Sequence, residues 1–387
     1  MMSKRALELY IHIPFCVRKC AYCDFLSFAA PERAYRDYVE KLIEELYGQS
    51  ASFQDYCVTS IFLGGGTPSI LPAKLVEELF AVLYECFDVA EDAEITIEAN
   101  PGTLTMEKLE TYLQSGINRL SIGLQSSDDE ELRTLGRIHC YDDFLKSYQR
   151  ARQAGFTNIS VDLMSALPGQ TVQSWKSTLR KVMMLKPEHI SAYSLIIEEG
   201  TLFYDRYHED ESAFPDEDAD REMYHLTKEL LAAQGYERYE ISNYAKPGYE
   251  CRHNTGYWTG VDYLGLGLGA SSYTHGFRYH NTIDMKEYLS LDLRESGAAA
   301  CDIQEMSMDE KMEEFMFLGL RMMEGVSGSE FLKRFDQNMW NVYGDVLKKL
   351  EKQGLIEVKA PMVRLTEFGI DVSNLVFEEF LMVHEEE

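Results

Sequence analysis

Short apolar runs recur through the first half of the chain, and each is followed by a loop and then by a helical pattern. The run from Leu7 to Ile13 comes first, and Pro31 then opens a helix with Tyr35, Val39 and Leu42 on one face and charges on the other. Further runs occupy residues 59–63, 94–99, 119–124, 158–163 and 189–197. This alternation predicts a parallel sheet whose strands are joined by crossover helices.

Six such units within about 200 residues suit an α/β fold of the partial (β/α)6 barrel type. The active sites of these barrels lie at the carboxyl ends of the strands. A doubly wound open sheet is the competing architecture, and periodicity alone does not exclude it.

The pattern changes after the sixth unit. Residues 205–304 begin as an acidic, helical segment and continue as a stretch rich in glycine, aromatic residues and asparagine. Residues 305–387 follow the order helix, helix, strand, turn and strand, which resembles a winged-helix module. We therefore expect a barrel over residues 1–204, an α/β extension over 205–304 and a winged-helix-like C-terminal domain over 305–387.

Charge limits the partners of this chain. The 387 residues carry 65 acidic and 37 basic side chains, a formal charge of −28. Residues 305–387 alone hold 18 acidic and 9 basic side chains, so even the winged-helix-like part is not expected to bind nucleic acid. No apolar run is long enough for a membrane span and the N-terminus lacks a signal-peptide core, which together favour a cytoplasmic protein.

Three cysteines, Cys16, Cys20 and Cys23, follow the first apolar run at spacings of four and three residues. A zinc site normally brings four ligands, and a disulfide framework needs a short, secreted, cysteine-dense chain. Three thiolates on one loop suit instead a [4Fe-4S] cluster that leaves one iron without a protein ligand. The other five cysteines are scattered singly and are expected to be small buried residues.

The C-x3-C-x2-C motif with Tyr22 before its third cysteine resembles the radical S-adenosylmethionine (SAM) superfamily. The flanking His-Ile-Pro-Phe-Cys16 and Tyr-Cys23-Asp-Phe25 are similar to the branch that holds oxygen-independent coproporphyrinogen III oxidases and haem chaperones. The resemblance implies that SAM chelates the free iron through its amino and carboxylate groups. It also favours the partial barrel over the open sheet.

The resemblance further implies which residues bind SAM. Glycine allows close backbone approach, and the strand-end loop Gly64–Pro68 matches the family loop that holds the SAM amino group. An arginine can pair with a carboxylate through two hydrogen bonds, and acidic side chains can accept from ribose hydroxyls. The implied SAM-binding residues are Tyr10, Tyr22, Gly65, Gly66, Thr67, Glu98, Gln125, Arg137 and Asp162.

Two features separate the members of this branch. The oxidases resemble C-x3-C-x2-C-x-C, whereas this chain has Phe25 at the last position. The chaperones carry His-Asn-x-x-Tyr-Trp, and here His253, Asn254, Tyr257 and Trp258 supply all of it. A neutral imidazole can ligate haem iron, and Tyr and Trp can cover a porphyrin face.

The resemblance therefore implies a haem chaperone that binds a [4Fe-4S] cluster, SAM and haem and passes haem to acceptor apo-haem proteins. The alternatives are an oxygen-independent coproporphyrinogen III oxidase and a radical SAM enzyme with an unrelated substrate. An electron donor is a further expected partner. Cleavage of SAM, homodimerisation and the haem ligand, His253 or another side chain such as Cys251, stay open at this point.

Overall fold

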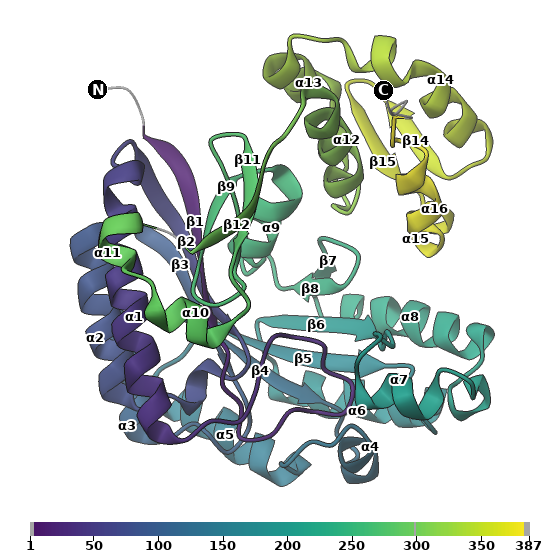
Figure 1. Ribbon diagram of the computed structural model, residues 1–387. Coiled ribbons are helices and arrows are strands. Elements are labelled where there is room, and N and C mark those ends of the chain that lie inside the picture. The colour runs from purple at the N-terminus through teal and green to yellow at the C-terminus, as the bar shows by residue number, and fades with distance from the viewer. Residues whose placement is uncertain (1–3, 298, 383–387) are drawn as a thin grey trace.

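The computed structural model describes residues 4–297 and 299–382. The outermost residues of the predicted first and last domains, 1–3 and 383–387, lie outside the described part, as does residue 298. Twelve strands form one sheet and three more form a second sheet near the C-terminus. Figure 1 shows the C-terminal helices and the small sheet standing beside the larger α/β body.

The larger sheet is built around six consecutive parallel strands. They are β1 (Arg5–Ile13), β2 (Tyr56–Gly65), β3 (Val89–Ala99), β4 (Arg119–Gln125), β5 (Ile159–Ser165) and β6 (His189–Ser194). The principal helices between them are α1 (Glu32–Ser50), α2 (Ala73–Cys86), α3 (Met106–Gln114), α4 (Asp129–Thr134), α5 (Tyr141–Ala154) and α6 (Val172–Leu185). The strands lie in sequential order, without the reversal of a doubly wound sheet, which confirms the partial barrel.

Strand β1 shows why the barrel forms. Leu7, Leu9 and Ile11 are fully buried in the hydrophobic core that the helices cover. Glu8, Tyr10 and the other residues of the opposite parity point to the other face, because successive strand residues alternate. Replacing Leu9 by alanine is expected to cost about 2–5 kcal/mol of folding free energy. The interior face of the barrel is consequently polar. The edge formed by the carboxyl ends of its strands can hold binding or catalytic residues.

The extension adds strands to both edges of the barrel sheet. Its elements are α7 (Leu202–Tyr207), α8 (Glu217–Ala232), β7 (Glu237–Arg238), β8 (Asn243–Ala245), α9 (Arg252–Thr259), β9 (Asp262–Leu266), β10 (Ser271–Thr274), β11 (Phe277–Asn281), α10 (Met285–Ser290), α11 (Leu293–Ser296) and β12 (Ala300–Glu305). β8 pairs antiparallel with β6, and β9 pairs parallel with β1. Residues 205–304 therefore share one sheet with the barrel.

The C-terminal part has its own core and its own antiparallel sheet. It contains α12 (Met308–Gly319), β13 (Val326–Ser327), α13 (Gly328–Phe335), α14 (Met339–Lys352), β14 (Ile356–Lys359), β15 (Met362–Leu365), α15 (Glu367–Asp371) and α16 (Ser373–Glu378). The three helices α12, α13 and α14 and the hairpin of β14 and β15 agree with the winged-helix-like prediction, with β13 added to the sheet and α15 and α16 following it. Helix α12 contacts α9 and so joins the module to the barrel extension.

Candidate functional site

The three motif cysteines lie on the loop between β1 and α1, which crosses the carboxyl ends of the barrel strands (Figure 1). The loop is fastened there by the amide of Ala21, which donates to the carbonyl of Leu135 at 3.0 Å, and by Arg18, which donates to the carbonyl of Gly136 at 2.7 Å. Cys16, Cys20 and Cys23 line one cavity of about 120 Å³. This thiol cavity also contains the ends of β2, β3, β4 and β5.

The donor set fits a cluster better than a single ion. Within residues 4–297 and 299–382, no three His, Cys, Asp or Glu side chains converge closely enough to hold one metal ion. A [4Fe-4S] cluster instead takes each thiolate on a separate iron. Burial raises the pKa of Cys23 to about 11, so this thiol is protonated at neutral pH and would release its proton on binding a metal centre.

Two glycines let the β2 loop approach the cysteine loop. Gly65 has φ +106°, and a Cβ atom there would lie 2.4 Å from the ring of His12. A Cβ atom on Gly66 would lie 2.7 Å from the carbonyl oxygen of Phe15. The amides of Gly66 and Thr67 donate to carbonyls of the first loop at 2.8 Å, so the glycines hold both loops together.

A chain of polar side chains links this loop to the cysteines. The Asn100 side-chain amide donates to the Thr67 hydroxyl at 2.7 Å and accepts from Arg137 at 2.7 Å. The hydroxyl of Thr67 is 3.3 Å from Sγ of Cys16, and Nη1 of Arg137 is 3.6 Å from Sγ of Cys20. Asn100 was not predicted as a site residue, although it directly follows a strand end, where such residues gather.

Glu98 and Asp162 also line the thiol cavity. Burial raises the pKa of Glu98 to about 8, and the charge of Asp162 adds to the effect. The amide of Gly65 donates to Glu98 at 3.1 Å, while Ser121 and Ser160 donate to Asp162 at 3.0 and 3.3 Å. Both carboxyl groups thus present acceptor atoms at the cavity, as ribose hydroxyls would require.

Three further predicted residues occupy different positions. Gln125 ends β4 in the left-handed region with φ 71°, lines the thiol cavity, and keeps its Oε1 atom buried without a hydrogen-bond partner. Tyr22 also lines this cavity. Tyr10 does not line the thiol cavity but a neighbouring groove, and its hydroxyl lies 3.0 Å from Nδ1 of His12. Sequence reasoning missed Tyr193 of β6, which completes the wall of the thiol cavity.

The neighbouring groove, called here the aromatic groove, has a volume of about 570 Å³. Its walls include Tyr10, Phe25, Tyr257, Trp258 and Arg278. Phe25 is 64% exposed and lines both this groove and the thiol cavity. The position that distinguishes this chain from the oxidase pattern therefore stands between the two spaces.

Helix α9 carries the whole His-Asn-x-x-Tyr-Trp motif. His253 is 1% exposed, with Nδ1 2.8 Å from the hydroxyl of Ser60 and Nε2 3.0 Å from the hydroxyl of Tyr257. Asn254 is half-buried and lines neither the aromatic groove nor the thiol cavity. The motif thus divides into a buried His253 and two aromatic residues, Tyr257 and Trp258, that reach the surface of the groove.

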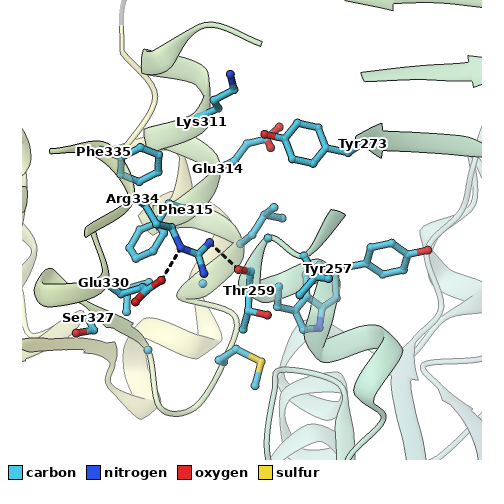
Figure 2. Close-up of a pocket in the computed structure, with 18 of the residues that line it drawn as sticks. Tyr257, Thr259, Tyr273, Lys311, Glu314, Phe315, Ser327, Glu330, Arg334 and Phe335 are labelled. Carbon is cyan, nitrogen blue, oxygen red and sulfur yellow. Dashed lines mark hydrogen bonds and ion pairs between the residues drawn. The ribbon is translucent and has the colours of Figure 1, made fainter. Parts of the chain in front are cut away.

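Tyr257 and Trp258 also line a second cavity, of about 420 Å³, between α9 and the C-terminal module. We call it the module cavity. Lys311 and Glu314 of α12 line it together with Tyr257 and Tyr273 of the extension (Figure 2). Arg321 lies over the Trp258 ring, 4.4 Å from its centroid.

The remaining cysteines correct one expectation. Cys86 and Cys251 are buried, but Cys57, Cys140 and Cys301 are half-buried. All eight cysteines are free thiols. Spacing along the chain does not reveal burial, because burial depends on what packs over each residue.

Comparison with known proteins agrees with this geometry. Residues 10–182 match the Radical SAM superfamily and residues 306–372 match the HemN C-terminal domain. The solved coproporphyrinogen III oxidase HemN of Escherichia coli, a radical SAM enzyme, superposes with a TM-score of 0.87 at 25% identity, covering 98% of this chain and 91% of HemN.

Proteins named haem chaperone HemW are similar over nearly their whole length. The protein of Lactococcus lactis is 37% identical, covering 98% of this chain and 99% of the relative. That of Bacillus subtilis is 38% identical, covering 96% and 98%. That of Escherichia coli is 36% identical, covering 98% and 100%.

The barrel, the three-cysteine loop and the strand-end residues define a radical SAM protein, whose cofactors are a [4Fe-4S] cluster and SAM. Within that superfamily, the chain belongs to the HemW family.

Proposed function

We propose that this protein is a haem chaperone that binds haem in the aromatic groove and transfers it to acceptor apo-haem proteins. The observation that carries the proposal is the position of Phe25, which links the thiol cavity to a groove walled by Tyr257 and Trp258. Aromatic side chains suit the faces of a porphyrin. The near-full-length similarity to proteins named haem chaperone supports the same function.

The residues of the thiol cavity have separate roles in this proposal. Cys16, Cys20 and Cys23 hold the cluster. Gly65, Gly66 and Thr67 bind the amino group of SAM, Arg137 binds its carboxylate, and Glu98 and Asp162 accept from its ribose. Gln125, Tyr22 and Tyr10 complete the surroundings of SAM, with Tyr10 acting from the side of the aromatic groove.

In the haem site, we assign direct contact with the porphyrin to Tyr257 and Trp258. His253 supports Tyr257 through the hydrogen bond at 3.0 Å, and its imidazole can reach iron only after this contact breaks. Cys251 is as fully buried as His253, and its thiol is 3.4 Å from Glu94. We assign no haem contact to Asn254, which contributes by holding helix α9 in position.

The partners and location follow from the same proposal. The cluster needs an electron donor, and eight free cysteines suit the reducing cytoplasm. In the described residues, no helix is long and apolar enough to cross a membrane. We also propose that the protein forms a homodimer. Sedimentation of the reconstituted protein at several concentrations tests this association.

Anaerobic reconstitution followed by haem titration tests the chaperone function. We expect a saturable haem band that weakens in Trp258→Ala, and transfer of the bound haem to an apo-haem protein. Haem binding no stronger than that of an unrelated acidic protein would contradict the proposal. A second assay addresses the oxidase alternative, which the similarity to HemN favours: the reduced protein is incubated with SAM and coproporphyrinogen III. Vinyl products in that assay would establish an oxidase.

A further inference from the structure

The aromatic groove and the module cavity share one cationic side chain, Arg278 of β11. Its guanidinium group lies over the ring of Tyr273, 5.6 Å from the centroid, and 40% of the side chain is exposed. The Nε atom is buried and has no hydrogen-bond partner. Arg278 therefore presents a fixed positive charge on an aromatic wall.

Arg278 is held by a carboxylate of the C-terminal module. Its two terminal nitrogens donate to the two carboxylate oxygens of Glu314, one of them at 3.1 Å. The Glu314 side chain is only 15% exposed, so the pair is partly desolvated. Partial desolvation strengthens such a pair, and also strengthens the attraction for any second anion that reaches the guanidinium.

A second cation stands one helical turn away on α12. Lys311 lines the module cavity, and its Nζ lies 3.1 Å from the position that a Cβ atom on Gly276 would take. It therefore reaches the turn between β10 and β11, two residues before Arg278. No ion pair of Lys311 occurs within the part of the chain that the structure describes. Among the described residues, Arg278 is the one Lys or Arg side chain along the aromatic groove. The module cavity is lined by three basic side chains, Arg278, Lys311 and Arg334, and by the acidic side chains Asp262, Glu314, Glu324 and Glu330.

We propose that Arg278 and Lys311 form a carboxylate-binding site that receives a propionate group of the porphyrin. This inference rests on the proposed function, because it assumes a porphyrin against Tyr257 and Trp258. An iron porphyrin of this class has an apolar ring and two carboxylates on one edge. The site has the matching division, with Tyr257 and Trp258 as aromatic walls and Arg278 and Lys311 as its cationic groups. Glu314 competes with the ligand for Arg278.

The test compares ferric haem with its dimethyl ester, which keeps the ring and the iron but lacks both carboxylates. Binding of each is measured by anaerobic titration of the reconstituted full-length protein. We expect wild type to bind haem about five- to tenfold more tightly than the ester, as one partly desolvated ion pair provides. Arg278→Gln and Lys311→Gln should reduce this preference, because each should weaken binding of haem more than binding of the ester. Glu314→Gln should increase the preference.

A matched control is Arg36→Gln, since Arg36 pairs with Glu78 on the helical surface of the barrel and lines none of the cavities described here. Equal affinity of wild type for haem and for the ester would overturn the carboxylate site and leave the chaperone function standing. The same holds if Arg278→Gln keeps the full preference. Failure of wild type to bind either compound would overturn the proposed function as well.

Discussion

The hydroxyl group of Tyr257 lies 3.0 Å from Nε2 of His253 and joins the buried and exposed halves of the His-Asn-x-x-Tyr-Trp motif. The hydroxyl of Ser60 lies 2.8 Å from the other ring nitrogen of His253, Nδ1. Burial lowers the pKa of His253 to about 3, so the imidazole is neutral at pH 7. A neutral imidazole has one donor and one acceptor nitrogen, and both are satisfied here.

The pair should act as one unit in haem binding. We expect His253→Ala and Tyr257→Phe each to weaken haem binding, and the double variant to bind no more weakly than the weaker single variant. Residues in one hydrogen-bonded unit show such non-additivity. Haem titrations of the four proteins measure the coupling. Additive effects would show that the two side chains contribute separately.

Glu8 should make stability depend on pH. Burial raises the pKa of Glu8 to about 9, a hydrogen bond from Ser60 opposes this, and the charge of Glu94 reinforces it. Its carboxyl oxygen is 3.9 Å from Nδ1 of His253, but both groups are neutral at pH 7 and form no ion pair. The folded protein thus keeps a proton that the unfolded chain loses near pH 4.5.

Because the folded state binds the additional proton, stability should fall as pH rises from about 4.5 to about 9. Glu8→Gln removes the titrating group at nearly constant shape. We expect the fall in Tm between pH 6 and pH 9 to be smaller in Glu8→Gln by roughly 4 °C. Glu40→Gln on the surface of α1, where the Glu40 side chain is 62% exposed, is the control and should keep the wild-type profile. An unchanged profile in Glu8→Gln would contradict the assignment.

The cluster should depend on three cysteines and on no other. We expect Cys16→Ser, Cys20→Ser and Cys23→Ser each to abolish the visible absorption and bound iron of the reconstituted protein, because each thiolate holds a separate iron. Cys301→Ser on β12 is the matched control and should keep the cluster. Iron analysis and absorption spectra provide the measurement. Retention of the cluster in all three motif variants would contradict this assignment.

Phe25 should contribute to haem binding without contributing to stability. Its side chain is 64% exposed, so Phe25→Ala is expected to change the free energy of unfolding by less than about 0.5 kcal/mol. Haem affinity should fall several-fold, because the ring lines the aromatic groove. Phe368→Ala is a control at 58% exposure in the C-terminal module. Denaturant unfolding and haem titration separate the two effects, and equal haem affinity in both variants would argue against a haem contact.

Gly65 should be required for both backbone geometry and SAM binding. Gly65→Ala places a Cβ atom 2.4 Å from His12 in addition to the strain of φ +106°. Gly235→Ala is the control, since Gly235 has φ +80° with no atom within 4 Å of the added carbon. The control should lose about 1 kcal/mol through backbone strain alone. Gly65→Ala should lose more and should also lose SAM binding by calorimetry. Wild-type SAM affinity in Gly65→Ala would be the contradicting result.

The sequence by itself determined the order of strands and helices and, through the family resemblance of its cysteine motif, the barrel and the position of the thiol cavity, because the signals for these features are local. Alternation in β1 separates Leu7 and Leu9 from Glu8 and Tyr10 within a few residues. The cysteine spacing and the strand-end glycines are equally local. Parallel strands bring their carboxyl ends to one edge, so local strand ends are sufficient to predict which residues gather there.

Only the tertiary structure decided how those residues work together. Ser60 and His253 are 193 positions apart, and Asn100 meets both Thr67 and Arg137 across three strand ends. Packing between distant segments buries His253, places Phe25 on the walls of both the aromatic groove and the thiol cavity, and pairs Arg278 with Glu314. No pattern in a short window encodes such contacts, because they arise where the extension packs against the barrel and the C-terminal module packs against the extension.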